Sequence, residues 1–123
     1  MGKRSDIEIR CVKGIQAYIG DLQQIITDSN IQSFQDLKKS LAPKYAVTQL
    51  ITNIYELSKE LHSDTLQSLV EFSKINIRVV RQLASHKYKL IDFKPVFATC
   101  LQLTSESVSN ELTKFQKEAH SDC

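Results

Sequence analysis

Apolar residues recur along most of this chain at steps of three and four, the period of an amphipathic helix. The first stripe, over residues 6–28, consists of Ile7, Cys11, Ile15, Tyr18, Ile19, Leu22, Ile25 and Ile26. Ser33 and Asp36 have the spacing of a capping pair, which predicts a short helix that ends near residue 41. Glycine and proline are scarce, and the turn dipeptides of β-proteins are missing. The pattern therefore predicts an all-α fold.

Three longer helices are expected after the short one. Pro43 suits a first helical turn, Ser63-Asp64 caps the next helix, and Asp92 caps the last, with Pro95 in its first turn. The five predicted helices span residues 6–28, 33–41, 43–61, 63–85 and 92–115. The connections are short, so we expect one domain over residues 1–123, frayed at 1–5 and 118–123. Four main helices and one short helix predict an up-and-down bundle.

Basic side chains are concentrated in one part of the sequence. The net charge is only +2, but residues 74–94 carry six basic side chains against one acidic side chain, Asp92. The rest of the chain has ten basic and thirteen acidic residues. Such a local patch can attract phosphates, although a charge run of this kind is more often a solvated helix face.

The cysteines and the hydropathy indicate the cellular compartment of the protein. Cys11, Cys100 and Cys123 are far apart, with no spacing typical of metal ligands, so we expect reduced thiols and no bound metal. Cys11 and Cys100 fall on apolar helical stripes and are expected to pack as small hydrophobes. No apolar run approaches the roughly 18 residues of a membrane span. We therefore expect a cytoplasmic protein that makes no contact with membranes.

The junction between the last two predicted helices holds the side chains best suited to chemistry. Near-neutral imidazole, as in His86, can take the proton from a ribose 2′-hydroxyl. A guanidinium such as Arg81 can bind a phosphate through two hydrogen bonds and stabilise the charge that develops on it. Tyr88 can stack on a base or donate a hydrogen bond. Together these groups could cleave RNA without metal or cofactor.

Purely structural roles are also open to side chains of this kind. His86 lies near a predicted helix end, where an imidazolium can simply cap the helix, and the same holds for His62. Glu56 and Glu60 are one helical turn apart, but two acids on a solvated face usually serve solubility. No phosphate-binding glycine loop, HExxH motif or serine triad motif occurs in the chain.

A longer motif surrounds the Arg81–His86 pair. The run Arg81-Gln82-Leu83-Ala84-Ser85-His86-Lys87-Tyr88, followed by Ile91-Asp92 and Val96-Phe97, resembles the HepT-like branch of the HEPN superfamily. Residues 46–61, with Tyr55-Glu56-Leu57 near their end, resemble the second long helix of that family, and Phe34 with Leu37 its short segment between helices. The likeness extends over about residues 6–115, and its specific part is residues 81–97.

The resemblance implies a particular function. Proteins of this branch are toxins of bacterial toxin–antitoxin modules, homodimers that cleave RNA without metal, and their partner is a minimal nucleotidyltransferase antitoxin. It implies that Arg81 and His86 are catalytic, that Gln82 orients the substrate, and that Tyr88 is both a contact and the acceptor of AMP groups. Arg78, Lys87 and Lys89 would bind the RNA, which would be a tRNA or an mRNA.

The sequence departs from the family pattern at two places. Gln82 stands where the family commonly has Asn or Asp, and the Trp that often precedes the motif Arg is absent. Because Gln82 lengthens the amide, an alternative stays open: a non-catalytic module that binds a nucleotide or the nucleotidyltransferase. A helical adaptor, in which Arg81 and His86 only cap and pair, is the third hypothesis.

Overall fold

The computed structural model describes residues 6–75, 79–80, 83 and 91–121, and the regular secondary structure in these ranges is entirely helical. The prediction of an all-α fold is confirmed for this part of the chain. The helices with defined bounds are α1 (Asp6–Asp28), α2 (Phe34–Lys39), α3 (Leu41–Ser58), α4 (Ser63–Ser68), α5 (Val70–Ser73), α7 (Phe93–Leu103) and α8 (Glu106–Ser121).

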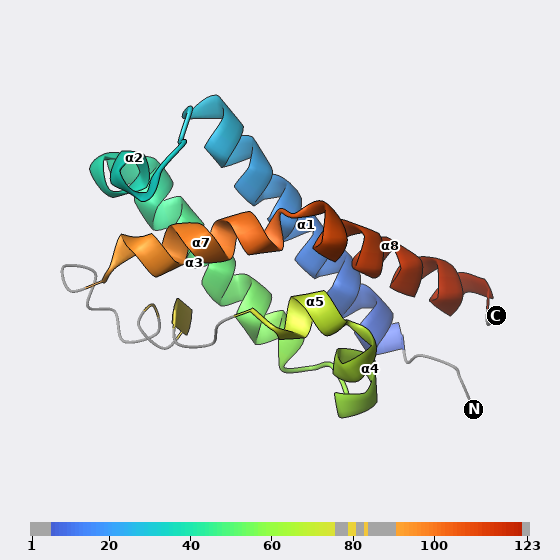
Figure 1. The fold of residues 1–123 in the computed structure, drawn as a ribbon. Helices are drawn as coiled ribbons and strands as arrows, with labels where there is room; N and C mark the ends of the chain where they lie inside the picture. Colours follow the sequence, from blue (N-terminus) through green and yellow to red (C-terminus); the bar gives the residue numbers. More distant parts are fainter. Residues whose placement is uncertain (1–5, 76–78, 81–82, 84–90, 122–123) are drawn as a thin grey trace.

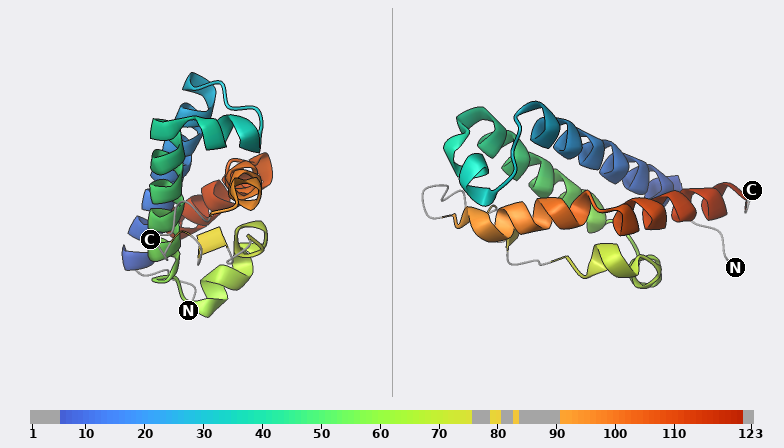
Figure 2. Two further views of the ribbon diagram at one scale, coloured as in Figure 1. Left: turned by 90° about the vertical axis from the view of Figure 1, so that its left-hand side faces the viewer. Right: turned by 45° about the horizontal axis from the view of Figure 1, so that its top comes forward.

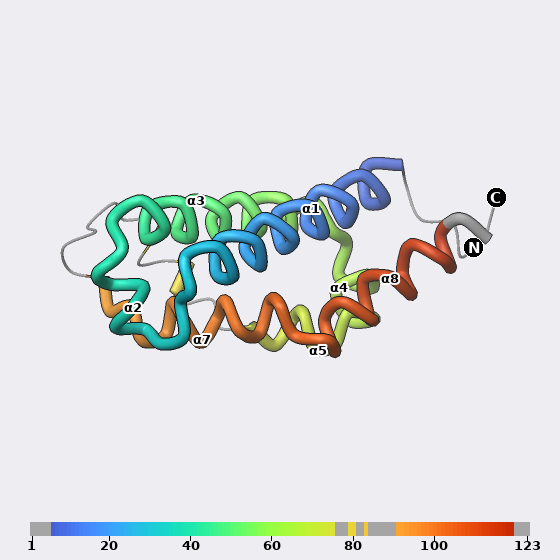
Figure 3. The backbone as a smooth tube through the Cα atoms, turned by 90° about the horizontal axis from the view of Figure 1, so that it is seen from above, coloured from blue at the N-terminus to red at the C-terminus, as the bar shows by residue number. Residues whose placement is uncertain are grey.

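The long helices lie in two layers (Figure 1). Helices α1 and α3 run side by side in opposite directions, and α7 and α8 follow one another along the second layer (Figure 3). The end-on view in Figure 2 shows the α1–α3 pair on one side and α7 with α8 on the other. At one end α2 packs against α3 and α7, and at the other end α5 packs against α8.

The buried stripe of α1 differs from the predicted one at its first turn. Ile7 is 57% exposed, whereas Glu8 is 2% exposed. Glu8 is in register with Val12 and Ile15, which are fully buried, because steps of four and three residues keep all three on one face. An acidic side chain thus occupies a core position, where it needs hydrogen-bond partners.

The carboxylate of Glu8 finds these partners in the segment that leads into α4. Its Oε2 accepts a hydrogen bond from the backbone N–H of His62 at 2.9 Å, and its Oε1 lies 3.6 Å from His62 Nδ1. His62 is the N-cap of α4 and Ser63 is already the first helical residue, so the predicted cap at Ser63-Asp64 is wrong. α3 already ends at Ser58, three residues before the predicted end.

The connection from α1 to α2 is capped on both sides, and the cap at Ser33 was predicted from the sequence. Asn30 has a left-handed backbone with φ 52°, and Ile31 N–H donates to Ile26 C=O at 3.0 Å, the bond that closes a helix end of the Schellman type. At the start of α2, Ser33 Oγ accepts from Asp36 N–H at 3.2 Å, and Asp36 Oδ2 accepts from Gln32 N–H at 2.9 Å. The short helix is therefore confirmed, as Phe34–Lys39.

The single helix predicted over residues 63–85 is interrupted at Leu69, whose ψ of 66° is not helical. In a continuous helix, the N–H groups of Glu71 and Phe72 would donate to the carbonyls four residues earlier. Here they donate to the two carboxylate oxygens of Glu111 on α8, at 2.8 and 3.0 Å. A tertiary acceptor has replaced the local ones, which separates α4 from α5. α5 itself ends at Ser73, so the predicted helix to residue 85 is wrong at this point too.

The single helix predicted over residues 92–115 is also divided. α7 ends at Leu103, and Thr104 Oγ1 donates to Cys100 C=O at 2.8 Å. Ser105 then precedes α8, and its Oγ accepts from Val108 N–H at 3.4 Å, as an N-cap does. α8 continues to Ser121 with Ala119 buried, beyond the point where fraying was expected.

Helices α1 and α3 approach each other closely at Gly14. A Cβ added to Gly14 would lie 2.7 Å from Leu57 Cδ1, whereas a Cβ added to Gly20, on the same helix, would meet nothing within 4 Å. Gly14 is thus a packing position, and Gly20 is an unfavoured residue in an open part of a helix.

We expect Gly20→Ala to raise the free energy of unfolding by about 0.5–1 kcal/mol, because alanine loses less backbone entropy in a helix. Gly14→Ala gains the same helix propensity but must displace the end of the Leu57 side chain. The change in its free energy of unfolding is therefore smaller or negative. Urea unfolding of the two variants measures the difference. Equal stabilisation by both would contradict the close approach of α1 and α3.

Removal of the Glu111 carboxylate tests the tertiary cap. Glu111→Ala leaves two N–H groups without their acceptors and is expected to lower the free energy of unfolding by about 1–2 kcal/mol. Thr113→Ala, at an exposed position of the same helix, serves as the control. Amide hydrogen exchange should accelerate at Glu71 and Phe72 in Glu111→Ala, and unchanged exchange there would refute the cap.

Candidate functional site

The predicted site residues lie outside the described ranges. This holds for Arg78, Arg81, Gln82, His86, Lys87, Tyr88 and Lys89, so each stays a candidate on the sequence motif. What the structure describes is the chain on both sides of the motif.

Before the motif, the chain is anchored in the core. Val79 and Val80 are helical and 1% and 8% exposed, and Leu83 is helical and 2% exposed. Leu83 belongs to the motif itself and separates Arg81 from His86 in the sequence. An apolar position inside the motif is thus fixed by packing, which is how a scaffold holds a segment that carries polar groups.

After the motif, the chain is anchored again at the start of α7. Ile91 is buried, and Asp92 Oδ1 accepts a hydrogen bond from Lys94 N–H at 3.0 Å, which confirms the predicted cap. Phe93 and Val96 are 5% and 0% exposed. Residues 84–90, which include His86, therefore join two buried anchors, Leu83 and Ile91.

A cavity of about 300 Å³ lies beside Val80, just before the motif in the sequence. Its walls come from α3, from the α4–α5 segment and from α7, and Val80 contributes to them. The apolar part of the lining consists of Ile51, Ile54, Leu66, Phe72, Ile75, Val80 and Leu103. Tyr55, Ser58 and Lys59 add polar groups, but Lys59 Nζ is already paired with Glu56 at 3.1 Å. No acid–base pair for catalysis faces this cavity in the described part.

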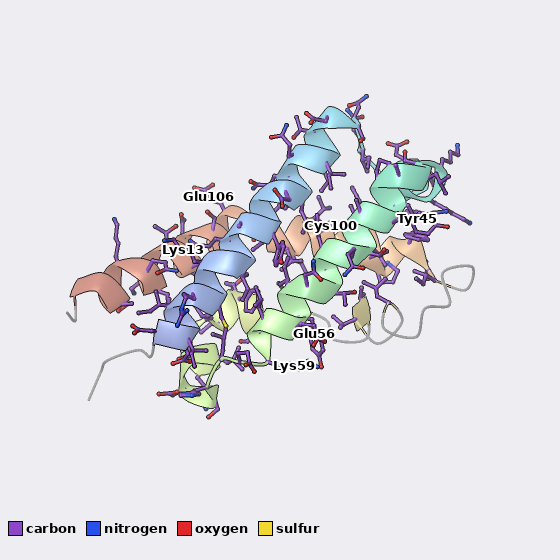
Figure 4. All side chains as sticks on the ribbon, turned by 180° about the vertical axis from the view of Figure 1, so that it is seen from behind. Lys13, Tyr45, Glu56, Lys59, Cys100 and Glu106 are labelled. Atoms are coloured by element: carbon purple, nitrogen blue, oxygen red, sulfur yellow. The ribbon has the colours of Figure 1, made fainter. Side chains whose placement is uncertain are left out.

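The described residues offer little other chemistry. No group of three potential metal ligands occurs among them. Glu56, which the sequence places one helical turn from Glu60, pairs with Lys59 on the surface, and Figure 4 shows Glu56 and Lys59 near the end of α3. His62, 70% exposed in its side chain, lies beside the buried Glu8 and has a structural partner.

Two acids that hold the fold together were not predicted from the sequence. Glu8 and Glu111 both lie on apolar stripes: Glu8 precedes Val12 by four residues, and Glu111 precedes Phe115 by four. An acid at such a position is the signal for a buried carboxylate, because the helical period places it toward the core. The N–H groups that donate to it, however, are far away in the sequence.

The two described cysteines are buried free thiols, as predicted. Burial raises the pKa of Cys100 to about 12. Burial, followed by the nearby carboxylates of Glu60 and Glu8, also raises the pKa of Cys11. A thiol that keeps its proton at neutral pH is a poor nucleophile, so both serve packing.

Comparison with known proteins adds no relative. No protein-family model, no curated protein and no solved structure matches this chain. The family resemblance therefore rests on the motif residues alone.

None of the helices in the described ranges combines the length and the apolar character that crossing a bilayer demands.

The raised pKa of Cys100 predicts a loss of stability at high pH. Native Cys100 keeps its proton up to about pH 12, whereas an unfolded cysteine loses it near about pH 8.5. Above that pH the unfolded state binds fewer protons, so the free energy of unfolding falls by up to about 1.4 kcal/mol per pH unit. Urea unfolding at about pH 8 and pH 10 should show a smaller fall in Cys100→Ala. Parallel pH profiles would contradict a protonated native thiol.

Proposed function

We propose that this protein is a metal-independent endoribonuclease, the toxin of a HEPN-type toxin–antitoxin pair. The observation that carries the proposal is the run from Arg81 to Tyr88, continued by Ile91-Asp92 and Val96-Phe97. Two features of the described structure support it. The fold is all-helical, and the apolar positions of the motif, Leu83, Ile91 and Val96, are buried.

The proposed chemistry needs a base, an acid and a positive clamp. His86 takes the proton from a 2′-hydroxyl, whose oxygen attacks the adjacent phosphorus and expels the 5′-oxygen of the next nucleotide. That oxygen leaves with a proton from an imidazolium, and Arg81 stabilises the charge on the phosphate. The products are a 2′,3′-cyclic phosphate and a 5′-hydroxyl, and no step consumes water or a metal.

The same motif supports the remaining assignments. The helices form an up-and-down four-helix bundle of the HEPN kind, which dimerises so that two copies of the motif share one cleft. Gln82 orients the phosphate, and Arg78, Lys87 and Lys89 hold the flanking backbone. A nucleotidyltransferase antitoxin silences the site by attaching AMP to Tyr88, because a bulky anion beside His86 blocks the cleft and neutralises its charge.

The test is cleavage of total tRNA and of a model mRNA in excess EDTA. We expect His86→Ala and Arg81→Ala to lose at least about 100-fold in rate, the usual contribution of a general base or a charge clamp. His62→Ala is the matched control, since that imidazole contacts Glu8 and should leave cleavage unchanged. Equal cleavage by wild type and His86→Ala would refute the assignment of His86 as a catalytic residue.

Gln82 favours a second candidate function, a HEPN module that binds a nucleotide or the nucleotidyltransferase without cleaving RNA. The same experiment separates the two. A wild-type protein that leaves RNA intact, permits growth without its neighbour gene and still binds that enzyme would be the binding module. Restored cleavage in Gln82→Asn would identify the longer amide as the cause.

A further inference from the structure

We infer that a second surface of this protein, at the end where α2, α3 and α7 meet, binds the phosphate backbone of single-stranded RNA and stacks one base. The surface consists of Lys38, Lys39, Lys44, Lys94 and Tyr45, and we call it the lysine end. The inference rests on the proposed function for the identity of the polymer. Its residues come from three helices, and none belongs to the proposed catalytic motif.

Contacts between the helices bring these lysines to one end. α2 packs against both α3 and α7, and its last turn, with Lys38 and Lys39, is joined through Ser40 to the first turn of α3. Lys44 Nζ lies 5.8 Å from the centre of the Phe93 ring, which ties the start of α3 to the start of α7. Lys94 follows directly on Phe93. Figure 3 shows α2 and the beginnings of α3 and α7 at the same end of the molecule.

The four ammonium groups are available for an anion. Lys38, Lys39 and Lys94 are exposed, Lys44 is half-buried, and no carboxylate of the described residues forms a salt bridge with any of the four. By contrast, Lys59 pairs with Glu56.

The acids at the lysine end are engaged elsewhere. Asp36 and Asp92 accept backbone N–H groups at the starts of helices, at 2.9 and 3.0 Å. Asp28, at the end of α1, accepts from Gln24 Nε2 at 2.9 Å. Each carboxylate keeps its charge but is held in a local hydrogen bond, and none of the three forms a salt bridge with one of the four lysines.

Charge is segregated over the described residues. They include ten basic and thirteen acidic side chains. Without the four lysines and the capping acids Asp36 and Asp92, six basic and eleven acidic side chains are left. Among the described residues, acids outnumber bases outside the lysine end, so a polyanion is attracted to the lysine end in preference to these other surfaces.

An aromatic ring distinguishes this surface from a plain cluster of lysines. Tyr45 is 46% exposed, and the Lys44 ammonium lies 5.4 Å from the centre of its ring. Figure 4 places Tyr45 at the opposite end of α3 from Glu56 and Lys59. Exposed aromatic rings among cations are how proteins hold single strands, since every base presents a face for stacking. A duplex, whose bases are already stacked, would not use the ring.

The apolar groups at the lysine end argue against an anionic membrane. Apart from Tyr45, the exposed large hydrophobe there is Leu41, and α2 has six residues. Binding in a membrane interface relies on a longer helix with a wide apolar face. The surface thus suits an RNA strand better than a lipid headgroup layer.

The test measures binding of a fluorescent single-stranded RNA to the full chain in the His86→Ala background, so that cleavage plays no part. Each phosphate contact adds about 0.7 to the slope of log affinity against log salt concentration. We expect Lys38→Gln/Lys39→Gln to lower that slope by about 1.4 and the affinity by roughly 25-fold at about 0.1 M salt. Lys94→Gln should lower the slope by about 0.7.

The matched control is Lys114→Gln/Lys117→Gln, which makes the same charge change at exposed positions of α8. It should leave the slope nearly unchanged. Tyr45→Ala should weaken binding about tenfold without changing the slope, since stacking carries no charge, and Tyr45→Phe should bind like wild type.

Three outcomes would overturn the inference. Equal losses in the two double variants would mean that net charge alone attracts RNA. Unchanged binding in Tyr45→Ala would remove the stacking contact, and tighter binding to vesicles of anionic phospholipid than to RNA would make the surface a membrane contact. If the protein binds RNA through the lysines but never cleaves it, the nuclease proposal is refuted and the inference about the lysine end stands. If the protein cleaves RNA but its RNA affinity does not depend on the four lysines, the inference about the lysine end is refuted and the nuclease proposal stands.

Discussion

Backbone N–H groups at the start of a helix need acceptors, and the segment that contains α4 and α5 receives them from two carboxylates on other helices. Glu8 on α1 accepts from His62 N–H, and Glu111 on α8 accepts from the N–H groups of Glu71 and Phe72. Each carboxylate lies at the positive end of a short helix dipole, where a negative charge is favoured. These bonds attach the segment to both layers of the fold.

The course of the chain toward the motif depends on this attachment. The helix that begins at Ser63 is broken at Leu69, and α5, which follows the break, packs against α8. Leu69 itself is 1% exposed and Phe72 is 7% exposed, so the turn also buries apolar surface. Val79, Val80 and Leu83 then enter the core. The polar caps thus fix the segment that precedes the buried residues Val79, Val80 and Leu83.

The sequence predicted those parts of the fold that depend on neighbours along the chain. The stripe of α1, the capping pair at Ser33 and the Asp92 cap are all local, and the structure confirms them apart from the first turn of α1. The breaks at Leu69 and Thr104 were missed for different reasons. At Thr104 the signal was present, since Ser105 before Glu106 has the form of an N-cap. At Leu69 the deciding acceptor, Glu111, is about 40 residues away, and no local pattern indicates it.

The two proposed RNA-binding surfaces differ in the same way, since one is local in the sequence and the other is not. A motif such as Arg81 to Tyr88 is contiguous, so the sequence can present it complete. The lysine end is assembled from α2, α3 and α7, and Lys38 and Lys94 are too far apart in sequence to be counted in one window. A sum over residues 74–94 therefore includes only Lys94 of the four lysines and misses Lys38, Lys39 and Lys44.

The arrangement of charge follows from these same contacts. A net charge of +2 gives no reason to expect a polyanion as partner. Packing of α2 on α7, however, gathers cations at one end, while the acids Glu8 and Glu111 serve as caps for the segment that contains α4 and α5. In the proposed function, the four cations at the lysine end attract an RNA strand and orient it before any contact forms. Since α7 begins at this end directly after the motif segment, orientation by the lysines and chemistry by the motif act on the same strand in the proposed function.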